Sequence, residues 1–244
     1  MRGLVSLIAL AALSACGGGE SGGNRSSGAP VAAVAPPAGK AWSEVVSQTP
    51  EGGYVMGNPN AAVKLVEYGS RTCPTCGQFG RDAMEPLETK YVSTGKVSYE
   101  FRDFLVHGPP DLAATLLGQC GGTEPFFPIL EQMYQNQPSY LEKLESAAEL
   151  QQRIQGQPPE RAMVAWAEHM GLIDFVKQRG IPEAKARACL SDRKAIDTLA
   201  KRMEEMSASG VVTGTPTFLI NGKPVEGVVV WSQLEPALKD AGAR

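Results

Sequence analysis

A cysteine pair at the end of a predicted strand is the feature that most constrains this 244-residue chain. Residues 63–68, VKLVEY, are mostly apolar and β-prone, and CPTC follows at residues 73–76. Pro74 suits the first turn of a helix. The pattern predicts that Cys73 stands at a helix N-terminus, with Cys76 about one turn inside the helix.

This position favours redox chemistry. The first N–H groups of a helix have no intrahelical partners, and together with the helix dipole they favour a nearby negative charge. They can lower the pKa of a cysteine from about 8.5 to between roughly 3.5 and 7.5, and the thiolate is the species that attacks disulfides. We therefore expect Cys73 to be the exposed nucleophile and Cys76 to be the buried resolving thiol.

A Cys-x-x-Cys pair can also be half of a zinc site, which needs two further Cys or His ligands at similar spacing. The sequence has no second such pair, and its only histidines are His107 and His169. We expect no metal and no other cofactor. Both histidines are interpreted as loop or surface residues, although His107 follows a predicted strand and is expected to border the active-site face.

Several separate segments resemble the thioredoxin superfamily and, within it, the DsbA-like periplasmic thiol:disulfide oxidoreductases. Glu67 lies six residues before Cys73, where that family keeps a buried carboxylate. Residues 99–104, YEFRDF, look like the family's second central strand, and residues 212–218, VTGTPTF, are similar to the loop whose proline is cis. The resemblance covers most of the chain from Tyr54 onward, and it implies an α/β thioredoxin fold with an all-helical insertion.

The resemblance assigns roles to three residues around the cysteines. Pro216 is expected to be cis, which turns the Thr215 backbone toward the sulfurs, where a substrate chain can pair with it; the alternative is a trans proline that begins a strand. Isomerases of the superfamily often have Thr before this proline, whereas the main oxidase has Val. Thr75 replaces a histidine of the best-studied members, so we expect a smaller lowering of the Cys73 pKa and a less oxidising potential.

Glu67 is a lone carboxylate in an apolar strand, and burial should raise its pKa. We interpret it as a proton acceptor, through water, for Cys76. The alternative is a side chain that faces solvent at the end of the strand.

The N-terminal residues 1–16 are interpreted as a lipoprotein signal peptide. Arg2 precedes an apolar run at residues 4–13, which is too short to span a bilayer core of roughly 30 Å. The letters LSAC, ending at Cys16, resemble a bacterial lipobox, and Gly17 favours the outer over the inner membrane by the sorting rule of Gram-negative lipoproteins. We expect a periplasmic protein anchored to a membrane by lipid on Cys16; an ordinary signal peptide is the alternative.

The remaining chain divides by composition and periodicity. Residues 17–53 are rich in Gly, Ser, Ala and Pro, which predicts a flexible linker. Residues 54–107 and 192–244 are expected to form the two parts of the thioredoxin fold, and the helical periodicity of residues 108–191 predicts the insertion.

Finer features follow from local signals. We predict an edge strand at 54–56, a helix over 73–92 with a kink at Pro86, helical pieces separated at 121–122, 137–138 and 156–159, a loop at 151–159, a helix over 192–209, strands at 217–220 and 225–230 joined by an Asn-Gly turn, and a helix over 231–241.

Cys120 and Cys189 remain after the lipid site and the CPTC pair. In an exported protein two such thiols most simply form a structural disulfide, and closing a loop of about 70 residues stabilises by about 3 to 5 kcal/mol in the chain-entropy model. A second redox relay is the alternative. The arrangement is similar to the second, non-catalytic disulfide of some alphaproteobacterial DsbA-like proteins.

The net charge of −3, without a basic stripe, gives no indication of nucleic-acid binding. The expected function is that of a monomeric periplasmic oxidoreductase that forms disulfides in unfolded or partly folded exported proteins through Cys-Pro-Thr-Cys. A membrane redox partner, a quinone-linked oxidase, would reoxidise it. The alternatives are an isomerase or reductase of the same fold, and a non-catalytic lipoprotein chaperone or scaffold whose cysteine pair is structural.

Overall fold

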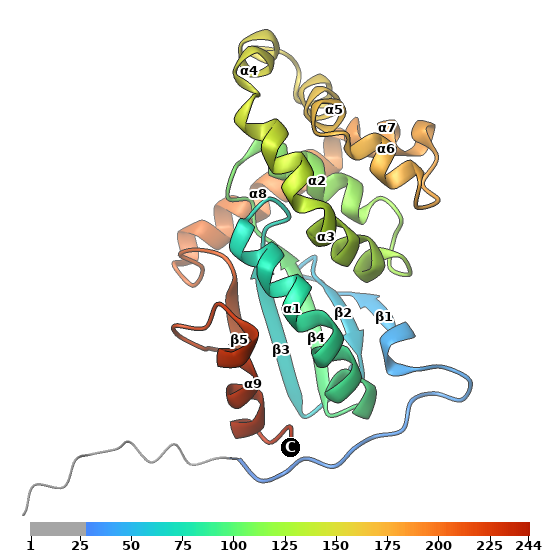
Figure 1. Cartoon of the computed structure of the whole chain (residues 1–244), viewed down its shortest axis with the longest axis vertical. Coiled ribbons are helices and arrows are strands. Elements are labelled where there is room, and N and C mark those ends of the chain that lie inside the picture. The colour runs from blue at the N-terminus through green and yellow to red at the C-terminus, as the bar shows by residue number, and fades with distance from the viewer. Residues whose placement is uncertain (1–27) are drawn as a thin grey trace, which may run out of the picture.

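The computed structural model describes residues 28–244, and its centre is a six-stranded mixed sheet (Figure 1). The strand order is β1-β2-β4-β3-β5-β6. β3 and β4 run parallel, and the other neighbouring strands of this sheet are antiparallel. The strands are β1 Val46–Gln48, β2 Tyr54–Gly57, β3 Val63–Gly69, β4 Val97–Asp103, β5 Thr217–Ile220 and β6 Lys223–Pro224.

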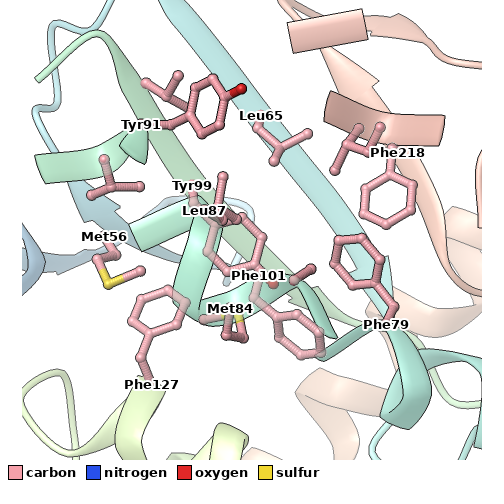
Figure 2. Close-up of a cluster of buried hydrophobic side chains, with 14 of the residues drawn as sticks. Met56, Leu65, Phe79, Met84, Leu87, Tyr91, Tyr99, Phe101, Phe127 and Phe218 are labelled. Atoms are coloured by element: carbon pink, nitrogen blue, oxygen red, sulfur yellow. The ribbon is translucent and has the colours of Figure 1, made fainter. Parts of the chain in front are cut away.

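Three helices cover the two faces of the sheet. α1 (Pro74–Lys90) and α9 (Trp231–Asp240) contribute to the large apolar core on one face, and α8 (Arg193–Ser209) packs on the other. Figure 2 shows the first of these cores, where the apolar stripe of α1 meets side chains of the central strands. Pro86 lies inside α1 without ending it.

The helical insertion has a core of its own. Its helices are α2 Pro109–Gln119, α3 Phe126–Glu145, α4 Ala148–Ile154, α5 Pro159–Met170, α6 Leu172–Lys177 and α7 Glu183–Leu190. Cys120, which follows α2, and Cys189 of α7 form a disulfide with an S–S distance of 2.02 Å. The predicted α/β fold with an all-helical insertion is confirmed.

Helix α3 connects the two cores. Phe127 and Tyr134 belong to the core under the sheet, whereas Ile129 and Met133 belong to the core of the insertion. The break predicted at 137–138 is wrong, because α3 continues through Pro138 to Glu145. The predicted loop at 151–159 is wrong in its first part, where α4 extends to Ile154 and Leu150 is buried against the insertion core.

Two strand predictions also need correction. β2 is not an edge strand, because β1 pairs with it on the outer side. The Asn221-Gly222 turn forms, with φ of 51° and 77°, but pairing with β5 covers only Lys223 and Pro224 and ends at the Val225 N–H, which donates to Phe218 O at 2.9 Å. The strand predicted over 225–230 is absent, and Gly227 within it has a φ of 71°, which is incompatible with extended pairing.

The linker predicted over residues 17–53 extends too far along the chain. Residues 28–41, here called the N-terminal strap, lie along the domain through the hydrogen bonds Gly28 N to Asp240 O (2.6 Å) and Val34 N to Thr94 O (2.9 Å). Trp42, at the start of a short 3-10 helix (Trp42–Glu44), is 6% exposed, and its indole Nε1 donates to Val34 O. A second 3-10 turn, Val92–Thr94, follows α1.

The predicted signal peptide and Cys16 lie outside the described residues. Within residues 28–244, no helix combines the length and apolar character that a membrane span requires.

Candidate active site

The cysteine pair lies where β3 gives way to α1. Cys73 is the N-cap residue of α1, Pro74 is its first residue, and the Cys76 backbone N–H donates to Cys73 Sγ at 3.4 Å. Both cysteines are free thiols. Cys76 is fully buried, as expected, but the expected exposure of Cys73 is wrong, because the cis-proline loop and α1 leave only 8% of it exposed. Pro74 and Thr75 are exposed on the first turn of the helix. The predicted helix start at the pair is confirmed.

The two thiols differ strongly in acidity. The pKa of Cys73 is lowered to about 5, chiefly by hydrogen bonding from the Cys76 thiol; burial opposes this, and the Thr215 hydroxyl and the N–H groups of Cys76 and Thr75 favour the thiolate further. The pKa of Cys76 is raised well above its ordinary value, first by burial and then by its bond to Cys73 and the negative charge of Glu67. At neutral pH, Cys73 is therefore the thiolate and Cys76 the thiol.

A loop far away in the sequence faces the pair. The Thr215–Pro216 peptide bond is cis, and Cys73 Sγ lies 3.4 Å from the Thr215 carbonyl oxygen. The structure thus brings the predicted residues Thr215 and Pro216 directly against Cys73.

Glu67 lies beneath the pair in β3 and is fully buried, which excludes the solvent-facing alternative. Burial raises its pKa to about 8, although the hydrogen bond from the Tyr99 hydroxyl to Glu67 Oε2 (2.7 Å) acts in the opposite direction. Glu67 Oε1 has no hydrogen-bond partner among the described residues. Glu67 is therefore mostly protonated at neutral pH.

A buried carboxylate on the far side of the pair was not found from the sequence. Asp111 Oδ2 accepts hydrogen bonds from Ser70 Oγ (2.7 Å) and from the backbone N–H of Val106 (2.8 Å), and burial raises the pKa of Asp111. Thr72 Oγ1 lies 2.7 Å from the ring Nδ1 of the exposed His107. This network ties the segment before Cys73 to the β4–α2 loop, and it places His107 at the border of the site.

Helix α3 supplies three further donors to the segment before the pair. Gln137 Nε2 donates to the carbonyl oxygens of Cys73 (2.8 Å) and Arg71 (3.2 Å), and Tyr140 OH donates to Arg71 O (2.8 Å). Tyr134 OH donates to Ser70 O at 3.4 Å. The spacing of these three residues is compatible with one face of a helix and could have indicated a shared role. The helix break expected at Pro138 prevented this interpretation.

Arg71 is also missing from the sequence-based site. Its side chain is completely buried, and Arg71 Nε lies 2.7 Å from Asp103 Oδ1. Asp103 accepts further hydrogen bonds from Thr115 and Gln119 of α2. This buried ion pair fixes the insertion beside the loop that carries Cys73.

Two predicted features lie apart from the pair. His169 is on α5, where Nε2 contacts Lys143 O at 2.7 Å, and the Cys120–Cys189 disulfide belongs to the insertion. In the part of the chain that the structure describes, no group of three or more His, Cys, Asp or Glu residues is arranged to hold a metal ion.

Comparison with known proteins gives consistent relationships. A family model described as Thioredoxin matches residues 49–240. The chain is 26% identical over 183 residues to a putative protein-disulfide oxidoreductase of Rickettsia bellii; the match covers 75% of this chain but only 62% of that relative. It is 29% identical over 202 residues to disulfide bond formation protein D of Bacillus subtilis, covering 81% of each chain.

Solved structures show the same architecture. The crystal structure of a protein-disulfide isomerase from Novosphingobium aromaticivorans superposes with a TM-score of 0.72 at 29% identity, covering 77% of this chain and 95% of that one. Wolbachia pipientis α-DsbA1 superposes with a TM-score of 0.59 at 20% identity, covering 77% and 89%, which shows that the fold is DsbA-like.

Proposed function

The chain belongs to the thioredoxin family, and from that premise we propose that it is a thiol:disulfide oxidoreductase that forms disulfides in exported proteins. The observation that carries the proposal is the contrast within one pair: Cys73 has a pKa of about 5 at a helix N-terminus, and Cys76, one turn away, has a raised pKa. This contrast is what a dithiol needs if one sulfur is to leave readily and the other is to resolve.

The reaction begins from the Cys73–Cys76 disulfide. A substrate thiolate attacks Cys73 Sγ, the bond between Cys73 and Cys76 breaks, and Cys76 leaves as a thiolate that takes up a proton. Glu67, protonated at neutral pH and electrostatically coupled to Cys76, is the proton donor for this step. In the reverse direction Glu67 accepts that proton.

The mixed disulfide is resolved by the second thiolate of the substrate, which attacks the substrate's own sulfur. Cys73 then leaves as a thiolate, and the two electrons that the substrate thiols lose in forming their disulfide reduce the Cys73/Cys76 pair. A low pKa makes Cys73 a good leaving group in this step. The cis-proline loop would hold the substrate backbone at Thr215, as an added strand.

The surface supports binding of unfolded chains. The exposed large apolar residues of the described part of the chain are Val34, Val106, Val211 and Val229, and three of these four flank the site. Val106 precedes His107, and Val211 and Val229 line a cleft beside the cis-proline loop. These exposed apolar residues would bind a partner chain that itself exposes apolar side chains.

An isomerase or reductase of the same fold is the second candidate, and Thr215 before the cis proline favours it. The potential of the pair decides between them. The Cys73 pKa of about 5 falls between the values of about 3.5 for DsbA and about 7 for thioredoxin, which supports an oxidising pair weaker than DsbA.

Location and partners complete the proposal. The apolar run and Cys16 support export and a lipid anchor, with the outer membrane favoured over the inner. A monomeric enzyme on such an anchor would be reoxidised by a membrane redox partner, for which a quinone-linked oxidase is the expected type.

The deciding experiment equilibrates the full chain, in detergent, with glutathione buffers and measures the reduction potential of the Cys73/Cys76 pair. A value between about −120 mV, the DsbA end, and about −200 mV supports the oxidase. A value near −270 mV, the thioredoxin end, would mean that the protein reduces disulfides in its substrates. Failure to oxidise a reduced, unfolded protein faster than a Cys73→Ser control would favour the non-catalytic scaffold.

A further inference from the structure

A cavity in the helical insertion lies close to the cysteine pair, because His107 in its lining contacts Thr72, the residue before Cys73. We propose that it binds a large apolar side chain of the substrate, a few residues along the chain from the cysteine that is joined to Cys73. This inference rests on the proposed function and adds a specificity site to it.

The cavity has the size and lining for such a side chain. Its volume is about 450 Å³, and its apolar lining comes from Pro109, Pro110, Leu144, Ile154 and Trp166. The volume lies within the usual range of roughly 300 to 1,000 Å³ for ligand pockets. An aromatic side chain would bury most of its surface there, and His107 and Gln151 supply polar groups for the adjoining peptide bonds.

The cavity lies within reach of the reacting sulfur. His107, which lines it, contacts Thr72 through Nδ1 and Oγ1 at 2.7 Å, and Thr72 directly precedes Cys73. Consecutive Cα atoms are about 3.8 Å apart, and an extended chain advances about 3.3 Å per residue. A substrate cysteine joined to Cys73 therefore has its neighbours about two to four residues away at the mouth of the cavity.

Internal hydrogen bonds hold the wall nearest Cys73 in place. The carboxylate of Asp111 accepts from the backbone N–H groups of Val106 (2.8 Å) and His107 (3.4 Å), and also from Ser70 in the segment before Cys73. Pro109 and Pro110 restrict the backbone that follows. A cavity that is already formed loses little conformational entropy when it binds a side chain. The free energy of its contacts therefore contributes almost fully to the binding affinity.

The cis-proline loop and the cavity then have different roles. The cis-proline loop binds the substrate backbone at Thr215, and this contact does not depend on the substrate sequence. The cavity binds one side chain and so selects among sequences. Val106, 39% exposed and adjacent to His107, extends the apolar surface toward the cavity. Substrate cysteines that have an aromatic or large aliphatic residue nearby would be oxidised first.

The test uses the oxidised full chain and matched peptides with a single cysteine. Each peptide carries either Trp or Ser at one position, two to four residues before or after the cysteine. We expect the best-placed Trp peptide to react at least about tenfold faster than its Ser counterpart, the effect of burying one large apolar side chain. Ile154→Lys and Leu144→Lys, at half-buried wall positions, should abolish this preference and leave the rate with glutathione unchanged.

Val34→Lys is the matched control, because Val34 is 47% exposed on the N-terminal strap and lies outside the cavity lining. It should keep the Trp preference. Equal rates for Trp and Ser peptides, with glutathione still oxidised, would overturn the cavity proposal and leave the proposed function intact. A Trp preference that survives in whichever lysine variants fold would also overturn it, and loss of all thiol oxidation in the unmodified protein would overturn both.

Discussion

Thr75 occupies the exposed position immediately before the resolving cysteine, on the first turn of α1. Replacing it with His places an ionisable donor beside the Cys73 thiolate. We predict that Thr75→His lowers the Cys73 pKa below its value of about 5 and makes the pair more oxidising, by about 30 mV for each pKa unit. Thiolate absorbance against pH and glutathione equilibration measure the two effects.

Thr75→Val is the control for this prediction, since it removes the hydroxyl without adding a charge. An unchanged Cys73 pKa in Thr75→His would show that residue 75 does not contact the thiolate, and that the donors already present determine its acidity.

Glu67 makes the stability of the reduced protein depend on pH. In the folded state it keeps its proton up to a pH of about 8, whereas in the unfolded chain it ionises above about 4.5. The stability that comes from the protonated, buried carboxyl is thus complete below pH 4.5, and it is lost as the pH rises through 8. Glu67→Gln should remove this loss.

We therefore predict that Glu67→Gln gains stability relative to the parent as the pH rises from 5 to 8, by on the order of a few kcal/mol. Urea unfolding of both reduced proteins at several pH values measures the difference. A constant difference between the two proteins would mean that Glu67 ionises at its ordinary pKa.

At the scale of single residues, the sequence predicted the site residues that belong to one local motif. It missed the residues that strand pairing brings to the site from elsewhere in the chain. Cys73, Cys76 and Glu67 follow from one continuous stretch. Tyr99 reaches Glu67 only because β4 pairs in parallel with β3, with Tyr99 opposite Leu65. Nothing near Tyr99 in the sequence indicates that register.

Helix α3 is the element that holds the segment before the cysteine pair, and its Gln137 packs against Gly77 of α1. A Cβ built on Gly77 would collide with the amide group of Gln137, so Gly77 leaves the space that this side chain occupies. We predict that Gly77→Ala displaces Gln137 from the carbonyl oxygens of Cys73 and Arg71 and destabilises the protein by about 1 to 3 kcal/mol.

The matched measurement is a double-mutant cycle by urea unfolding. On a Gln137→Ala background the collision is gone, and Gly77→Ala should then destabilise far less than it does alone. Additive effects would contradict the contact between these two residues.

The elements that the sequence misjudged share a physical cause. Residues 28–41 contain few large apolar residues and so predict a tether, yet their backbone hydrogen bonds and the buried Trp42 hold them on the domain. Pro138 predicts a helix end, but packing of α3 on both cores carries the helix past it. Residues 225–230 are β-prone, but beyond the Val225 N–H, which bonds to Phe218 O, they have no partner strand in the described sheet. Tertiary contacts decided each of these cases.

At the scale of the whole molecule, two cores are joined by α3, and the disulfide stabilises only one of them. Cys120 and Cys189 close a loop that spans the insertion, with a sequence separation of 69. We predict that replacing both with Ala lowers the stability by about 3 to 5 kcal/mol, because the unfolded chain regains the entropy of that loop.

The reduction potential of the Cys73/Cys76 pair should not change in this double variant, since the two pairs are separate in the fold. Denaturant unfolding and glutathione equilibration measure these properties independently. A shift of the potential, with little loss of stability, would instead favour the redox relay.

The N-terminal strap gives the molecule a direction. Gly28 and Val34 are hydrogen-bonded to Asp240 and Thr94, close to where α1 ends, whereas Cys73 is at the start of that 17-residue helix, about 25 Å away (Figure 1). A protein held by its first residues would therefore present its reactive sulfur at the opposite pole. Seen from a membrane surface, such an enzyme would face outward, toward chains arriving from the surrounding solution.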